Sequence, residues 1–244
     1  MNLTEFQYSL FSFKNTNSIL ELENICRGYC RQLGFDSFVY ALRIPENFSD
    51  SRLIIVNGYP ESWVDHYFEQ AYYNADPVMS YCAKNILPIE WKNLPIEADS
   101  PESHMMNDAK KFGLQNGISM PIHTPHGEFG ILSFAIDDDT QQAHEITFRS
   151  LPFIQILAGH IHEALRRISG LHDKTMRPLS KREQECLKWA ADGKAAWEIA
   201  HILRISERTV NFHINNTMQK LEVCNRQHAV AKATLKGLIQ PSPF

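Results

Sequence analysis

The chain lacks any apolar run long enough to cross a membrane, and its first residues, MNLTEFQYSL, lack the basic start and apolar core of a secretory signal. Cysteine is scarce and odd in number, and the five residues are scattered, as is typical of free thiols in a reducing compartment: Cys26, Cys30, Cys82, Cys186 and Cys224. There is also no internal repeat and no low-complexity tract. We therefore expect a cytoplasmic protein that has no membrane partner.

Clusters of residues that carry enzymatic or metal chemistry are missing too. His160 and His162 stand two residues apart on a predicted helix, so they point to different faces and are unsuited to sharing a metal. His123 and His126 flank a predicted turn without a nearby cysteine or aspartate. No nucleophile stands beside a base. The sequence thus predicts no catalytic residue, no metal and no cofactor.

Apolar residues make up 43% of the 244 residues and aromatic residues 11%, enough for a substantial core in one large domain or two ordinary ones. The net charge of −4 is unevenly distributed. Residues 171–244 contain 12 Lys and Arg against 7 Asp and Glu, whereas residues 1–170 contain 12 against 21. A basic end on an acidic body indicates that only the end contacts a polyanion.

A segment rich in Gly, Pro and charge, without apolar periodicity, divides the chain. We predict a first domain at 1–169, a linker at 170–178 and a second domain at 179–244. In the first domain, apolar spacing and turn residues predict the order α-β-β-α-α-α-β-β-α. Because strands and helices do not alternate strictly, we expect an α+β fold: an α/β/α sandwich on an antiparallel sheet, with helix 140–168 bent near Pro152.

The second domain is predicted to contain four helices and no strand. The second and third helices are joined by Arg204, Ile205 and Ser206, a connection of helix-turn-helix length. In the third helix, three- and four-residue steps place Val210, Ile214, Thr217, Met218 and Leu221 on a packed face.

The opposite face of that helix carries side chains suited to DNA. Arg208 can pair with guanine, and Asn211 and Asn215 with adenine, in the major groove. Ser206 caps the helix and leaves N–H groups directed at an anion. The remaining candidates are expected to contact phosphates: Lys194, Thr209, His213 and Lys220.

This region resembles the DNA-binding domain of LuxR-type regulators, with Glu183, Leu187 and Gly193 at that family's pattern positions. The first domain contains NGYPESWVDHYFEQAYYNADPVMSYC, LPIEW and LQNGISMPIHTPHGEFGILSF. In order and spacing it resembles the acyl-homoserine-lactone-binding domain of quorum-sensing LuxR-type receptors, closest to the LasR-like branch. The residues that carry this resemblance are Tyr59, Trp63, Tyr67, Asp76, Pro77, Trp91 and Gly117.

The resemblance implies a homodimeric transcription factor whose partners are DNA and an N-acyl homoserine lactone. The chemistry of the residues fits that ligand. The indole N–H of Trp63 suits the lactone carbonyl and the carboxylate of Asp76 suits the amide N–H. Tyr59 and Ser133 can donate to the amide carbonyl. Trp91 is expected to face the lactone ring and Tyr67 the chain, with an acyl pocket formed by Val56, Val78, Phe129 and Leu132.

One departure and several alternatives stay open. Residue 78 is Val where related receptors often have Thr or Ser, which puts recognition of a 3-oxo group in question. The chain can also be a LuxR-type regulator of another ligand or of none. A phosphorelay regulator would place its acidic pair earlier than residues 137–139, and a lactone-cleaving enzyme would need a metal cluster. The last helix is expected to pair two copies through Ala229, Ala233 and Leu235.

Overall fold

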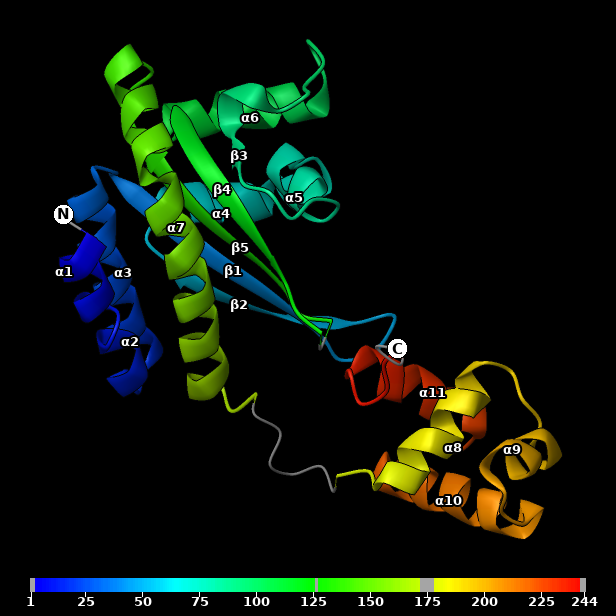
Figure 1. Cartoon of the computed structure of the whole chain (residues 1–244). Helices are drawn as coiled ribbons and strands as arrows, with labels where there is room; N and C mark the ends of the chain where they lie inside the picture. Colours follow the sequence, from blue (N-terminus) through cyan, green and yellow to red (C-terminus); the bar gives the residue numbers. More distant parts are fainter. Residues whose placement is uncertain (1–2, 126, 172–177, 242–244) are drawn as a thin grey trace. The chain divides into compact units, whose positions relative to one another are not determined.

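The computed structural model describes residues 3–125, 127–171 and 178–241. They fall into two compact units, one drawn mainly from the residues before 171 and one that contains the residues after 178 (Figure 1). Six residues of the predicted linker, 172–177, and the predicted turn residue His126 lie outside the described part.

The first unit is built on a five-stranded sheet in the order β2-β1-β5-β4-β3. The strands are β1 (Ser37–Pro45), β2 (Ser51–Asn57), β3 (Ile89–Glu90), β4 (Asn116–His123) and β5 (Phe129–Ile136). The pairs β1–β5, β4–β5 and β3–β4 are antiparallel. The predicted antiparallel sheet is therefore confirmed, whereas the two-residue strand β3 was not expected because so short a segment has no period.

Helices lie on both sides of this sheet, as the sandwich prediction requires (Figure 1). The helices α1 (Leu3–Ser9), α2 (Ser12–Asn15), α3 (Ile19–Leu33) and α7 (Gln141–Ile168) lie on one side. The other side carries α4 (Glu61–Glu69), η1 (Tyr72–Asn74), α5 (Pro77–Cys82), η2 (Trp91–Asn93) and α6 (Pro101–Lys111). The α+β class is confirmed, and the short helices α1 and α2 are additions to it.

Side-chain caps explain where several of these helices begin. Ser18 accepts a hydrogen bond from the backbone of Glu21 at the start of α3, and Thr140 does the same for Ala143 at the start of α7. The α3 helix ends where Gly34 adopts φ 89°, a left-handed conformation that glycine enters without steric cost.

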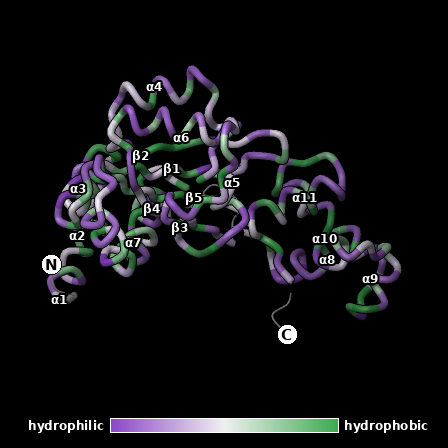
Figure 2. The backbone as a smooth tube through the Cα atoms, turned by 90° about the horizontal axis from the view of Figure 1, so that it is seen from above, coloured by the Kyte–Doolittle hydropathy of each residue, from purple (hydrophilic) through white to green (hydrophobic). Residues whose placement is uncertain are grey.

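The central strand β5 is buried on both faces, so its alternation decides which side chains face which helices. In Figure 2 the segment of β5 is mostly hydrophobic, whereas the helices alternate between polar and apolar residues. Ile131 and Ser133 line a cavity under α4, α5 and α6. Leu132 and Phe134, fully buried, therefore point to the side of α3 and α7.

The second unit contains α8 (Lys181–Ala191), α9 (Ala196–Leu203), α10 (Glu207–Lys220) and α11 (Arg226–Leu235). This confirms the predicted helical domain. The packed face of α10 is also as predicted, since Val210, Ile214 and Leu221 are buried in the core of this unit. Arg204 turns the chain between α9 and α10 at φ 55°, a left-handed conformation often taken by glycine. No helix in the described ranges is long and apolar enough to span a membrane.

Candidate functional site

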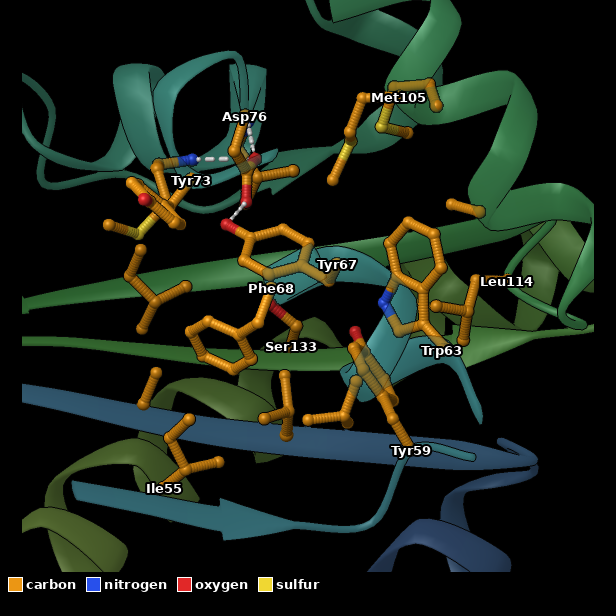
Figure 3. A pocket seen from close by; sticks show the side chains of 18 of the residues that line it. Ile55, Tyr59, Trp63, Tyr67, Phe68, Tyr73, Asp76, Met105, Leu114 and Ser133 are labelled. Atoms are coloured by element: carbon orange, nitrogen blue, oxygen red, sulfur yellow. Dashed lines mark hydrogen bonds between the residues drawn. The ribbon is translucent and has the colours of Figure 1, made fainter. Parts of the chain in front are cut away.

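A cavity of about 170 Å³ lies in the first unit between the sheet and the helices α4, α5 and α6 (Figure 3). Its walls are mostly aliphatic and aromatic, with polar groups at only a few positions. The polar or amphipathic side chains among its lining residues are Tyr59, Trp63, Tyr67, Tyr73, Asp76, Trp91 and Ser133. An apolar cavity with few polar groups is typical of a small-molecule site.

Asp76 caps α5 and also faces the cavity. Its Oδ1 accepts hydrogen bonds from the backbone N–H groups of Val78 (2.8 Å) and Met79 (3.1 Å). Its Oδ2 accepts one from the Tyr67 hydroxyl at 2.9 Å, which Figure 3 shows directed at the carboxylate. A carboxylate has about four acceptor positions, so Oδ2 keeps one for a donor in the cavity. Burial raises the pKa of Asp76, and the hydrogen bonds from Met79, Tyr67 and Val78 oppose that rise.

Ser133 stands at the end of a hydrogen-bond chain that begins at Trp91. The Trp91 indole N–H donates to Ser119 Oγ at 2.9 Å, and Ser119 Oγ lies 2.7 Å from Ser133 Oγ. Indole is a donor only, so Ser119 accepts from it and is left with its own proton to donate. Ser119 is fully buried and shares a hydrogen bond with Ser133 in which either hydroxyl can donate. With Ser119 as the donor, the Ser133 proton is left for the Tyr59 hydroxyl or for a ligand in the cavity.

Trp63 and Tyr59 supply two more donors. Trp63 is 4% exposed and lines the cavity, and among the described residues its indole N–H has no hydrogen-bond partner. In Figure 3 its nitrogen is directed into the cavity. Burial raises the pKa of the Tyr59 phenol, while the Ser133 hydroxyl partly offsets that rise. The phenol therefore stays protonated and able to donate at neutral pH.

Most of the residues that the sequence nominated for the ligand lie together. The cavity is lined by Tyr59, Trp63, Tyr67, Asp76, Val78, Trp91 and Ser133. Phe129 is buried in the adjacent core, stacks on His123 (centroids 5.1 Å apart) and is not among the lining residues. Trp91 packs across Gly117, where a Cβ atom would approach the indole to 2.7 Å. Only glycine leaves room for it.

Besides Phe129, two more of the expected acyl-pocket residues do not line the cavity. Leu132 and Val56 are each adjacent in sequence to lining residues, Ile131 and Ile55, and side chains alternate along a strand. They therefore face the helices on the other side of the sheet. Several lining residues were missed, namely Met105, Met106 and Ala109 of α6 and Leu114. Their apolar spacing on a predicted helix was the available signal, but it does not indicate which face meets a ligand.

The DNA-contact candidates of the second unit gather on α10. Ser206 accepts a hydrogen bond from the backbone N–H of Thr209 at 3.1 Å and so begins the helix. Arg208, Asn211 and Asn215 are exposed on one side of it, whereas Thr209 and His213 are half-buried. Phe212, which was not nominated, is 59% exposed on the same helix.

Lys220 and the last helix differ from expectation, whereas Lys194 does not. The Lys220 ammonium donates to Glu183 Oε2 at 2.7 Å and to the Pro178 carbonyl at 3.0 Å, so it is engaged inside the unit. Lys194 is more accessible and lies 3.5 Å from Glu198. Ala229 and Ala233 are fully buried in the unit's own core, which removes them as contacts between two copies. Leu235 is half-buried.

Comparison with known proteins identifies both units. Residues 18–165 match the family model described as an autoinducer binding domain. Residues 177–233 match the model described as bacterial regulatory proteins, luxR family.

In the described part of the chain no group of three or more His, Cys, Asp or Glu side chains is placed to hold a metal ion.

Similar proteins extend over nearly the whole chain. The transcriptional activator VanR of Vibrio anguillarum is 35% identical over 224 residues, covering 91% of this chain and 92% of VanR. LuxR of Aliivibrio fischeri is 34% identical over 205 residues, with coverage of 83% and 81%. The crystal structure of Escherichia coli SdiA superposes with a TM-score of 0.73 at 28% identity, over 97% of this chain and 98% of SdiA. The chain therefore belongs to the LuxR family of transcriptional regulators with an autoinducer-binding domain.

Proposed function

We propose that this regulator binds an N-acyl homoserine lactone in the cavity of its first unit and, as a homodimer, binds promoter DNA through α10. In this proposal residues 1–169 sense the ligand and residues 179–244 bind DNA. Because no step requires bond cleavage, the chain acts as a ligand-dependent regulator and not as an enzyme.

The observation that carries the proposal is the balance of donors and acceptors around the cavity. Asp76 offers one remaining acceptor position, while Trp63 and the hydrogen-bonded pair Tyr59–Ser133 offer donors. An acyl homoserine lactone presents the complement: one amide N–H, an amide carbonyl and a lactone carbonyl. Burying these groups costs little if each finds a partner. The aliphatic walls suit the acyl chain.

A second ligand class is favoured by one comparison. SdiA, with a TM-score of 0.72 and 27% identity to this chain, has a structure in complex with octanoyl-rac-glycerol. That molecule has an acyl chain and hydroxyl donors but no amide N–H. The Asp76 carboxylate distinguishes the two classes, because it gains a charge-assisted bond from an amide N–H at a fixed position.

The DNA half of the proposal rests on the exposed polar side of α10. Arg208, Asn211 and Asn215 are the candidates for base contacts, and Ser206, Thr209, His213 and Lys194 for phosphate contacts. Lys220 is removed from the phosphate set because Glu183 holds its ammonium. A two-fold dimer would bind half-sites about one helical turn apart.

Thermal shift and titration calorimetry on the full chain test the proposal. Acyl homoserine lactones with chains from C4 to C14 and 1-octanoyl glycerol would be compared. A ligand that binds only the folded state at 100-fold over its Kd stabilises that state by about 2.7 kcal/mol. We expect the largest shift from a lactone. A flat response to all lactones would contradict the proposal, and a larger shift with the glycerol ester would favour the second class.

A further inference from the structure

A carboxylate outside the cavity gathers three hydrogen-bond donors from three directions. Asp108, in α6, accepts from the Tyr72 hydroxyl at 2.6 Å and from His66 Nε2 at 3.2 Å, both on Oδ2. The Lys111 ammonium donates to Oδ1 at 2.6 Å. The bonds from Lys111, Tyr72 and His66 hold the pKa of Asp108 well below its usual range. Asp108 is thus ionised and an acceptor only at neutral pH.

Two of these donors are rings that pack on Trp63. The ring centroid of Tyr72 lies 6.1 Å from that of Trp63 with the planes 28° apart, and the His66 ring lies 6.2 Å away. Phe112, which follows α6, contacts both, at 5.4 Å from Trp63 and 5.2 Å from His66. The indole of Trp63 is therefore packed against rings, two of which are hydrogen-bonded to Asp108.

The same carboxylate joins two walls of the cavity. His66 belongs to α4, the helix of Trp63, and Tyr72 begins η1. Asp108 belongs to α6, which supplies Met105, Met106 and Ala109 to the lining. Because the hydrogen bonds span from α6 to α4 and η1, a change at Asp108 alters the orientation of Trp63 without touching the cavity.

The simpler interpretation is a surface ion pair between Asp108 and Lys111. The Lys111 side chain is 71% exposed, and exposed ion pairs of this kind contribute little to the stability of a fold. The bonds to Tyr72 and His66 differ, because Asp108 and His66 are only 25% and 28% exposed. In addition, Tyr72 and His66 are two of the rings that contact Trp63. The Tyr72 hydroxyl donates its proton to the Asp108 carboxylate, and this hydrogen bond raises the pKa of Tyr72 to about 12.

We propose that Asp108 is a positioning residue for the autoinducer site: through Tyr72 and His66 it orients the Trp63 indole so that its N–H meets the ring carbonyl of the ligand. This inference rests on the proposed function. It assigns Asp108, which never contacts the ligand, to the selection of lactone rings over rings without a carbonyl.

The test uses two ligands that differ only at that carbonyl: an acyl homoserine lactone, and the amide of 3-aminotetrahydrofuran with the same acyl chain, which keeps the ring oxygen. Titration calorimetry of the full chain gives the ratio of their dissociation constants. We expect this ratio to shrink about 3- to 10-fold in Asp108→Asn and in Tyr72→Phe. That change corresponds to the loss of one neutral hydrogen bond, the one between the Trp63 N–H and the ring carbonyl of the ligand. Lys111→Met, which removes only the exposed ion pair, should leave the ratio unchanged.

A Trp63→Phe background supplies the coupling control. There the ratio should already be reduced, and adding Tyr72→Phe should change it no further. Equal weakening of both ligands by Asp108→Asn and Tyr72→Phe would mean that the cluster only maintains the fold, and would overturn the inference while leaving the proposed function intact. Tyr72→Phe alone decides the matter if Asp108→Asn fails to fold. A parent protein that binds neither ligand would overturn both proposals.

Discussion

Replacing Asp76 by Asn isolates the contact on which the ligand assignment depends. Asn is a good helix cap, and its side-chain oxygen can keep the bonds from the backbone of Val78 and Met79. The other position becomes an NH2 group. The Tyr67 hydroxyl can reverse and accept from it, but an amide N–H of the ligand cannot. Two donors would then face each other in the cavity, while the fold stays intact.

The expected loss follows from the bond that disappears. A hydrogen bond to a charged group is worth about 1.5–3 kcal/mol, which corresponds to an increase in Kd of about 10- to 150-fold. Titration calorimetry should find this loss for the acyl homoserine lactone. For the matching ester, which has oxygen in place of the amide N–H, Asp76→Asn should lose no affinity, because the parent carboxylate gains no donor from it. An equal loss for amide and ester, or no loss for the amide, would refute the role of Asp76.

Three further measurements follow from the described contacts. Burial raises the pKa of Asp76 above 3.8, so the carboxylate becomes protonated as the pH is lowered. Protonation removes the acceptor for the ligand amide, and the affinity for the lactone should fall. Asp76→Asn should remove this pH dependence of affinity. Lys220→Met should lower the free energy of unfolding, measured in urea, by about 1.5–3 kcal/mol, because it leaves Glu183 buried and unpaired. Burial of Glu183 is outweighed by its bonds to Lys220 and Ser180, which lower its pKa, so this stabilisation is present above pH 4.5 and is lost as the pH falls through the lowered pKa. On DNA, Arg208→Ala should cost about 1–3 kcal/mol on the specific site and less on scrambled DNA, whereas Lys194→Ala should weaken both and reduce the salt slope by about 0.9; equal losses in both variants on both DNAs would contradict base reading by α10.

The sequence predicted the architecture well because its signals were local. Turn residues and apolar spacing predicted strands within DSFVYALRI (36–44) and RLIIVNGYP (52–60), which the structure has at Ser37–Pro45 and Ser51–Asn57. They also predicted the hairpin after Gly117 and the helices of the second unit. The elements that were not predicted depend on contacts between residues that are far apart in the sequence. The strand β3 has two residues and exists because it pairs with Ser119 and Ile118 of β4. No local pattern encodes such a pairing.

The candidate site shows the same limit at the level of single side chains. Leu132 and Ser133 are neighbours in sequence, yet alternation places only Ser133 in the cavity, and the phase is set by pairing with β1 and β4. Lys220 has the type of side chain that contacts phosphates in DNA complexes. Its ammonium is instead held by Glu183, 37 residues away in the chain. Ala229 and Ala233 have the small size of an interface stripe but complete the core of their own unit.

Two tryptophans illustrate why residue type alone cannot assign a ligand contact. Trp63 and Trp91 both line the cavity, and each has one indole N–H and no acceptor. Trp91 uses its N–H on Ser119, which is itself hydrogen-bonded to Ser133 in the cavity wall. Trp63 keeps its N–H for the cavity and is surrounded by rings that Asp108 holds in place. In the proposed site one indole is therefore free to donate to a ligand, whereas the N–H of the other is already used within the protein. That distinction lies in the hydrogen-bond partners, Ser119 and Asp108, neither of which touches the cavity or carries a recognisable motif.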